Sequence, residues 1–211
     1  IRVYRGLQLQ LVVYMDAAME MLRGQHPKKE ILPGGILYYH IDDPVLESDT
    51  PLSDEEAEQA LLFALRPDGL VNSGEEIYRA MDQNFEGKSQ MIPVEIKKNG
   101  EISTARSKVA STEEFAVITR YVEHEIRQCG EAIYAGNIAV NPYRSDIETS
   151  CTYCPYASVC GMDAKIPGYE YRQFASMKKE EVLDQMQTEL ARNRGKEERS
   201  DEMDEGTAER H

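Results

Sequence analysis

The chain has 211 residues, of which 41% are hydrophobic and 29% charged, and its formal net charge is −14 at pH 7. This composition suits one ordinary domain with extensions. The acidic balance makes the isolated chain a poor binder of DNA or RNA, whose phosphates require cationic partners. The sequence shows no apolar run long enough to span a membrane and no secretory signal, so we expect a cytoplasmic protein without membrane association. The chain opens with Ile1 rather than Met, which we interpret as a fragment or a processed piece.

The first part of the chain predicts one helix and one buried strand. Residues 5–22 predict an amphipathic helix, because apolar side chains recur at three- and four-residue steps: Leu7, Leu11, Tyr14, Ala18 and Leu22. The run 36–41 is rich in aromatic and β-branched residues and is apolar on both faces. It therefore predicts a buried central strand, which Asp42-Asp43-Pro44 ends because proline cannot continue a ladder.

Three later helices are predicted by capping boxes. In a capping box a serine side chain accepts the backbone N–H of a glutamate three residues later, and the glutamate side chain accepts the backbone N–H of the serine. The pairs are Ser53 with Glu56, Ser73 with Glu76, and Ser111 with Glu114. The longest helix follows Ser111, and its predicted apolar stripe comprises Phe115, Ile118, Val122, Ile126, Cys129 and Ile133.

The remaining segments are less regular. Residues 92–107 predict a hairpin or loop around Asn99-Gly100. Residues 137–171 show little periodicity, and an irregular segment of this length usually needs a cross-link, such as a metal site, to hold it together. An apolar stripe from Val182 to Leu190 predicts one more amphipathic helix, and after Arg194 we expect a mobile or extended acidic end. We therefore divide the chain into 1–172, which includes a cysteine cluster at 150–162, and a C-terminal helix with its tail at 173–211.

Three cysteines lie close together in the pattern C-x2-C-x5-C: Cys151, Cys154 and Cys160. A C-x2-C turn places two thiolates on one side of a tight loop, and thiolates select zinc, copper or iron–sulfur clusters over magnesium or calcium. Unliganded packing is disfavoured because three cysteines share ten positions, and a redox pair is disfavoured because no helix follows a strand there. The cluster predicts three ligands of a metal centre, and both zinc and [4Fe–4S] centres commonly need four.

The fourth ligand is not evident in the chain. Cys129 falls on an apolar helix stripe, which favours packing in the core over metal binding. The alternatives are a residue upstream of this chain, a solvent ligand, or a histidine among His26, His40 and His124, none of which has a suggestive spacing.

Gln10 and Tyr14 stand four residues apart on one face of the first predicted helix. Alone, this pair predicts a core tyrosine and a glutamine at the edge of the core. In order, however, GLQLQLVVY at 6–14, GILYYHIDDP at 35–44 and CTYCPYASVC at 151–160 resemble the B subunits of bacterial AddAB (RexAB-like) ATP-dependent helicase–deoxyribonucleases. The resemblance runs from the first residues to about Tyr171.

This resemblance implies an α/β fold: a helix-rich portion of a restriction-endonuclease-like nuclease domain of the RecB type, PD-(D/E)xK. It implies that Gln10 and Tyr14 match the nuclease Q-x3-Y motif in a supporting role, and that Cys151, Cys154 and Cys160 bind a [4Fe–4S] cluster. The parent would be an Mg²⁺-dependent exonuclease that works with a helicase–nuclease A subunit on DNA. Its role would be the resection of double-strand breaks for recombinational repair.

The sequence departs from that family in one respect. Only nine residues precede Gln10, so the Asp, the Asp/Glu and the Lys that hold the metal in the family are missing, and we expect the fragment alone to be inactive. An amide such as Gln10 neither holds Mg²⁺ by charge nor activates water. Two alternatives remain: a non-catalytic zinc or protein-interaction module stapled by cysteines, and a CRISPR-associated RecB-like exonuclease.

Overall fold

A computed structural model describes the backbone of residues 1–39, 41, 44–48, 50–83, 85–145 and 148–208, and the side chains of these residues up to Asn193. The chain divides into two compact units, one made of Leu9–Thr119 and the other of Ile1–Gln8 together with the chain from Arg120 onward. Each unit is described by itself. The boundary predicted at residue 172 stays a prediction.

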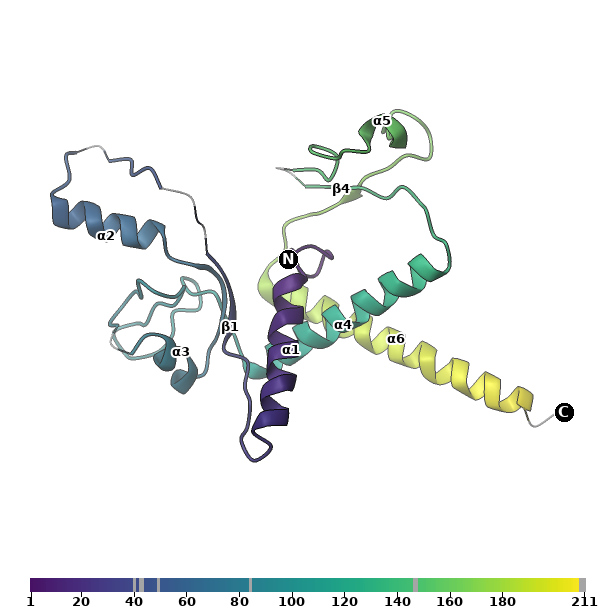
Figure 1. Ribbon diagram of the computed structural model, residues 1–211, viewed down its shortest axis with the longest axis horizontal. Helices are drawn as coiled ribbons and strands as arrows, with labels where there is room; N and C mark the ends of the chain where they lie inside the picture. The colour runs from purple at the N-terminus through teal and green to yellow at the C-terminus, as the bar shows by residue number, and fades with distance from the viewer. Residues whose placement is uncertain (40, 42–43, 49, 84, 146–147, 209–211) are drawn as a thin grey trace. The chain divides into compact units, whose positions relative to one another are not determined.

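The unit Leu9–Thr119 contains the first helices and the larger sheet (Figure 1). Its elements are α1 (Gln10–Gln25), β1 (Gly35–Tyr38), α2 (Asp54–Ala64), β2 (Asp68–Asn72), α3 (Glu75–Met81), β3 (Val109–Ala110) and the first turns of α4 (Thr112–Tyr134). Helix α1 begins five residues later than predicted. Gly6 and Gln8 have positive φ values of 77° and 58°, so the chain turns sharply there and cannot be helical.

The sheet has the order β1-β2-β3, with β1 antiparallel to β2 and β2 parallel to β3. The predicted strand at 36–41 exists, but it is not central: among the described residues β1 lies at the edge of the sheet, and its four residues are half-buried. The prediction was wrong because a short run that is apolar on both faces does not report how many neighbouring strands it has. His40, Asp42 and Asp43, which belonged to the same prediction, lie outside the described residues.

The core of this unit lies beside β2 and β3. Its buried members are Val71, Tyr78, Phe85, Ile92, Val94, Ile96 and Val109. The predicted hairpin at 92–107 is confirmed by the antiparallel bridge between Ile96 and Ile102 and by the turn in which Gly100 N–H donates to the Lys97 carbonyl at 2.9 Å. Gly100 takes a φ of 86° there, which a glycine adopts without steric strain.

Two of the three capping boxes are confirmed. Ser53 and Glu56 form a complete box at the start of α2, and the Ser111 and Glu114 side chains each accept the other's backbone N–H before α4. The Ser73 box was wrong: Gly74 is the N-cap of α3 and no side chain caps it. The Ser73 N–H donates instead to the Ala110 carbonyl, so Ser73 continues the pairing of β2 with β3.

The second unit contains most of α4, β4 (Tyr143–Arg144), α5 (Ala157–Cys160), β5 (Arg172–Gln173) and α6 (Lys179–Ala208). The segment from 137 to 171 has little regular structure, as predicted, and the parallel pair β4 and β5 joins its two ends (Figure 1). Tyr143 and Phe174 stack across this pair with ring centroids 5.0 Å apart. The backbone pairing of β4 with β5 and this ring stacking therefore hold the two ends of the segment together.

The predictions for the two long helices were partly confirmed. The N-terminal part of the α4 stripe is buried (Phe115, Ile118 and Val122), but Ile126, Cys129 and Ile133 are exposed, so the stripe does not continue as core. In α6 the residues Val182, Leu183 and Met186 are buried as predicted. A mobile or extended end was expected after Arg194. The extended alternative was wrong, because α6 runs to Ala208; glutamate, lysine and arginine, which are frequent there, are good helix formers. No described helix is both long enough and apolar enough to span a membrane.

Candidate functional site

Gln10 and Tyr14 form a polar pair on the first turns of α1. The Gln10 Nε2 atom donates a hydrogen bond to the Tyr14 hydroxyl oxygen at 2.6 Å, and both side chains are exposed. Tyr14 is 59% exposed, whereas Val12 is 1% exposed. The prediction that Tyr14 packs in the core was therefore wrong, and the apolar side of α1 is centred on Val12 rather than on the predicted stripe. A paired amide and phenol at the surface of a helix can contact a ligand.

The segment that leads to the cysteines is fixed to β4 by short-range hydrogen bonds. The Tyr143 N–H donates to Ser150 Oγ at 3.1 Å, and the Thr149 hydroxyl donates to the Tyr143 carbonyl at 2.9 Å. Thr149 Oγ1 also accepts the N–H of Cys151 at 3.3 Å. The first cysteine is therefore tied to β4 through its backbone.

The three cysteines lie in a tight loop that ends with α5. Each of them is half-buried and none forms a disulfide. The Cys154 N–H faces the Cys151 carbonyl at 3.4 Å, Cys160 is the last residue of α5, and Gly161 closes that helix with a φ of 62°. Within the described residues, however, no three His, Cys, Asp or Glu side chains converge in a way that could hold a metal ion. The donor chemistry suits a soft metal, but the loop as it stands does not present a formed site.

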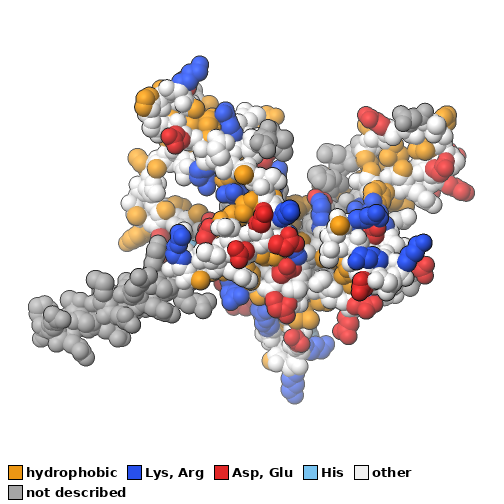
Figure 2. All heavy atoms as spheres, turned by 180° about the vertical axis from the view of Figure 1, so that it is seen from behind, with side chains coloured by type: hydrophobic (Ala, Val, Ile, Leu, Met, Phe, Trp, Pro, Cys, Tyr) orange, Lys and Arg blue, Asp and Glu red, His pale blue; other side chains and the backbone are white. Residues whose placement is uncertain are grey.

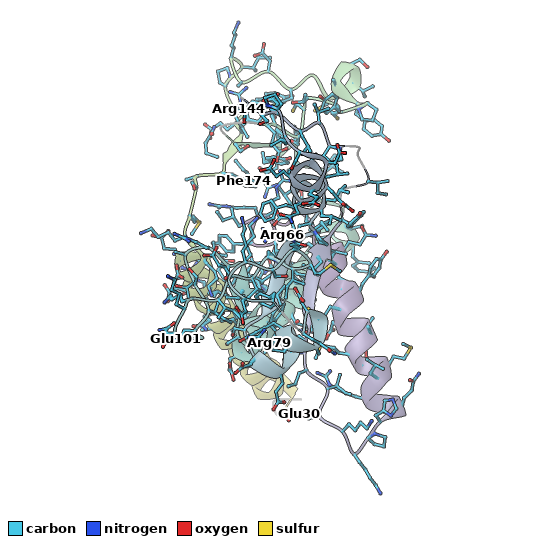
Figure 3. The ribbon with its side chains drawn as sticks, turned by 90° about the vertical axis from the view of Figure 1, so that its left-hand side faces the viewer. Glu30, Arg66, Arg79, Glu101, Arg144 and Phe174 are labelled. Atoms are coloured by element: carbon cyan, nitrogen blue, oxygen red, sulfur yellow. The ribbon has the colours of Figure 1, made fainter. Side chains whose placement is uncertain are left out.

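Tyr171 interacts with Cys151 and with Arg144, and no sequence pattern predicted either contact. A hydrogen bond between the Tyr171 hydroxyl and Cys151 raises the pKa of Tyr171, together with desolvation and the charge of Cys151. The guanidinium of Arg144, which is labelled in Figure 3, lies 4.3 Å from the centre of the Tyr171 ring and opposes that rise. Tyr171 stands twenty positions after Cys151, so no local spacing could have indicated their proximity.

The other candidate ligands lie elsewhere. Cys129 is exposed on α4, which contradicts the predicted core position. His124 contacts the Asn193 side chain at 2.8 Å, and His26 is exposed just after α1. His40 lies outside the described residues. None of the described histidines therefore belongs to a group that could complete the cysteine set.

Charges are mixed on the surface. On the face shown in Figure 2, acidic and basic side chains are interspersed, with hydrophobic side chains between them. No continuous basic patch is visible on the described part of that face, which agrees with the net charge of −14. The polar pair on α1 and the cysteine loop are therefore the features with the most specific chemistry.

Comparison with known proteins gives these features a context. Residues 2–161 match the family profile of the PD-(D/E)XK nuclease superfamily. Over 188 aligned residues the chain is 38% identical to the B subunit of the ATP-dependent helicase/deoxyribonuclease of Thermoanaerobacter sp. (strain X514), covering 89% of this chain and 16% of that protein. The corresponding B subunit of Lachnoclostridium phytofermentans is 40% identical, with 85% and 16% covered, and that of Clostridium botulinum (strain Hall) is 39% identical, with 89% and 16% covered.

The chain thus spans about one sixth of the length of these relatives. The matches confirm the resemblance drawn from the three motifs and the predicted restriction-endonuclease-like α/β class. The profile includes α1 with its polar pair and the loop up to Gly161. The chain belongs to the PD-(D/E)XK nuclease superfamily.

Proposed function

We propose that this chain is the part of a nuclease domain that follows the catalytic lysine, within the B subunit of an ATP-dependent helicase–deoxyribonuclease. The parent protein hydrolyses DNA phosphodiesters and, with a helicase–nuclease A subunit, resects double-strand breaks for recombinational repair. The observation that carries the proposal is the exposed, hydrogen-bonded pair of Gln10 and Tyr14 at the start of a helix that lies within the nuclease profile.

The role of the pair is positional. Gln10 carries no charge, so it neither binds Mg²⁺ strongly nor activates water. The hydrogen bond from Gln10 fixes the Tyr14 hydroxyl and leaves that group's own proton free to be donated to a phosphate or to a neighbouring catalytic group. In the parent, bound Mg²⁺ supplies the activation of water. The described residues include no group of carboxylates that could hold it. We propose that the polar pair contributes orientation.

For the cysteine loop we propose that Cys151, Cys154 and Cys160 supply three thiolates to a [4Fe–4S] cluster in the parent and that the fourth ligand lies outside this chain. The support is the spacing of the three residues and their half-buried position on one loop. The loop does not present a formed metal site. Metal binding commonly completes the folding of such a site, so we propose that cluster assembly draws the three sulfur atoms together.

The test uses the full-length parent protein in complex with its A subunit. Gln10→Ala should lower the kcat of Mg²⁺-dependent DNA hydrolysis by about 10–100-fold, because a misplaced catalytic group costs on that order. Tyr14→Phe should cause a similar loss because it removes the hydroxyl. ATP hydrolysis should be unchanged in both.

Gln25→Ala is the matched control, since Gln25 is an exposed glutamine at the other end of the same helix. It should retain full nuclease activity. Full activity in Gln10→Ala would contradict the proposal. So would an equal loss in Gln10→Ala and Gln25→Ala, because that result would point to a general effect on α1.

A further inference from the structure

Glu189 on α6 bridges two tyrosines that stand 117 positions apart in the sequence, Tyr4 and Tyr121. The Tyr4 hydroxyl lies 2.7 Å from Glu189 Oε1, and the Tyr121 hydroxyl lies 3.2 Å from Glu189 Oε2. The two rings pack against each other with centroids 5.5 Å apart. One carboxylate therefore joins the N-terminal segment Ile1–Gln8, the part of helix α4 from Arg120 onward and helix α6, all within one compact unit.

The hydrogen bonds of this cluster can be assigned by counting protons. Each tyrosine hydroxyl has one proton and an oxygen that accepts. The Tyr4 hydroxyl donates to Glu189, and the Tyr121 hydroxyl has two acceptors in reach, Glu189 Oε2 and the Tyr4 carbonyl at 3.0 Å. The cluster thus holds both the side chain and the backbone of Tyr4.

The pKa shifts of Tyr4 and Tyr121 support the same assignment of the two hydroxyls as hydrogen-bond donors. Burial raises the pKa of Tyr4 and of Tyr121, and the negative charges of Glu125 and Glu189 add to both effects. Arg5 acts in the opposite direction on the pKa of Tyr4. Both hydroxyls accordingly keep their protons and remain donors.

Arg5 provides a second attachment of the same segment. Its guanidinium lies 5.1 Å from the centre of the Tyr4 ring and 5.0 Å from that of Phe174. Phe174 follows β5 and is labelled in Figure 3. The Arg5 Nη2 atom approaches the Met177 sulfur at 3.5 Å, and its Nε is buried without a hydrogen-bond partner among the described residues. Arg5 is therefore held mainly by stacking. The polar anchoring of the segment comes from Glu189, which is partly buried, and from the more exposed pair in which Arg2 Nη2 donates to Glu148 Oε1 at 3.1 Å.

We infer that Glu189 is a positioning residue for the nuclease reaction: it anchors the segment Ile1–Gln8, from which the chain enters α1 and Gln10. Only Leu9 separates that segment from Gln10. Glu189 contacts neither substrate nor reacting atoms in this role and acts through the backbone that precedes the polar pair. The inference rests on the proposed function of Gln10.

The test compares Glu189→Ala with Glu189→Gln in the full-length parent complex. The glutamine retains one oxygen to accept from Tyr4, and its amide can donate to the Tyr121 oxygen while Tyr121 donates to the Tyr4 carbonyl. The alanine removes both bonds. We expect Glu189→Ala to lower the kcat of DNA hydrolysis by about tenfold or more, with the KM for DNA and the rate of ATP hydrolysis unchanged, and Glu189→Gln to stay within about twofold of the parent.

Asp184→Ala, which removes an exposed carboxylate from the same helix, is the control and should leave every rate unchanged. Hydrogen exchange of the amides of residues 2–12 provides a readout that does not depend on activity: exchange should be faster in Glu189→Ala than in Asp184→Ala or Glu189→Gln. Unchanged kcat in Glu189→Ala overturns the inference. So does a glutamine variant as impaired as the alanine, or an alanine variant that loses ATP hydrolysis in parallel.

The two proposals fail in different ways. If Gln10→Ala is fully active, the function proposed for the polar pair is wrong, and with it the reaction that Glu189 would serve. If Gln10→Ala is impaired and Glu189→Ala is not, only the positioning role is wrong.

Discussion

The side-chain amide of Asn72, the last residue of β2, donates a 2.8 Å hydrogen bond to the carbonyl of Pro33, just before β1. The same amide nitrogen donates to Thr112 Oγ1 at 3.0 Å, and the amide oxygen accepts the Gly74 N–H at 2.9 Å. Asn72 is only 1% exposed. One buried side chain therefore ties together the segment before β1, the end of β2, the start of α3 and the start of α4.

Asn72→Ala should lower the free energy of unfolding of this chain by about 2–4 kcal/mol, because it leaves buried groups without hydrogen-bond partners. Urea denaturation followed by circular dichroism measures the change. Asn99→Ala is the control, since Asn99 makes its bonds to Glu101 in an exposed turn, and it should change stability by about 0.5 kcal/mol or less. Equal losses in the two variants would show that the Asn72 contacts do not stabilise the fold.

The pairing of β1 with β2 depends on a glycine. Gly69 has a φ of 153°, and a Cβ atom built on it would lie 2.0 Å from the Ile36 carbonyl oxygen and 2.9 Å from the Leu37 Cα. Because both atoms belong to the backbone of the partner strand, no side-chain rotation can relieve the clash. We predict that Gly69→Ala lowers the free energy of unfolding by about 3 kcal/mol or more.

Gly24→Ala provides the contrasting substitution in the same unit. Gly24 lies inside α1, and a Cβ atom there would meet nothing within 4 Å. Alanine should raise stability by about 0.5–1 kcal/mol, since it is the better helix former. Urea midpoints of the two variants should therefore move in opposite directions. A Gly69→Ala protein as stable as the parent would mean that β1 and β2 separate without loss.

Local chemistry made several elements predictable from the sequence. Ser53 with Glu56 and Ser111 with Glu114 satisfy helix ends through contacts three residues apart, so their outcome depends little on the rest of the chain. Ser73 has the same local pattern with a different outcome. Its N–H pairs with Ala110, which is 37 positions away, and that sheet contact outweighs the local box.

The candidate site was predictable in its residues but not in its surroundings. The spacing of Gln10 and Tyr14 indicated their shared face, but the exposure of Tyr14 depends on which side of α1 packs, and Val12 occupies that side. Cys129 falls at the helical spacing of the apolar residues of α4, which predicted a core position. It is exposed, because no described residues pack over the C-terminal half of that apolar stripe. Glu189 and Tyr171 act over long sequence separations, which no periodicity encodes.

The cysteine loop makes a prediction about metal content. In the purified full-length parent, Cys151→Ser, Cys154→Ser and Cys160→Ser should each lower bound iron and acid-labile sulfide by about tenfold or more, since even partners of ligands contribute about 10–100-fold to metal affinity. Cys129→Ser is the control, because Cys129 is an exposed residue of α4 away from the loop. Bound zinc without sulfide would support the alternative of a zinc module. An equal loss in Cys129→Ser would contradict the assignment of ligands.

The Tyr121 cluster predicts a loss of stability at alkaline pH. An unfolded tyrosine has a pKa of about 10, and burial, together with the charges of Glu125 and Glu189, raises the pKa of Tyr121 in the folded chain. Below about pH 10 both the folded and the unfolded chain hold the Tyr121 proton, so the contribution of Tyr121 to the free energy of unfolding does not change with pH. Above that pH the unfolded chain releases the proton while the folded chain retains it. Stability should therefore fall as the pH rises toward the folded pKa.

Urea midpoints at about pH 9 and about pH 11 measure this fall, and Tyr121→Phe should reduce it because phenylalanine has no proton to release. Part of the fall should remain in that variant, since the pKa of Tyr4 is raised as well, chiefly by burial. Tyr134→Phe is the matched control: Tyr134 is 96% exposed on the same helix, so its loss should leave the alkaline dependence as it is in the parent. If Tyr121→Phe and Tyr134→Phe behave alike, the protonated hydroxyl of Tyr121 does not stabilise the junction of α4, α6 and the N-terminal segment.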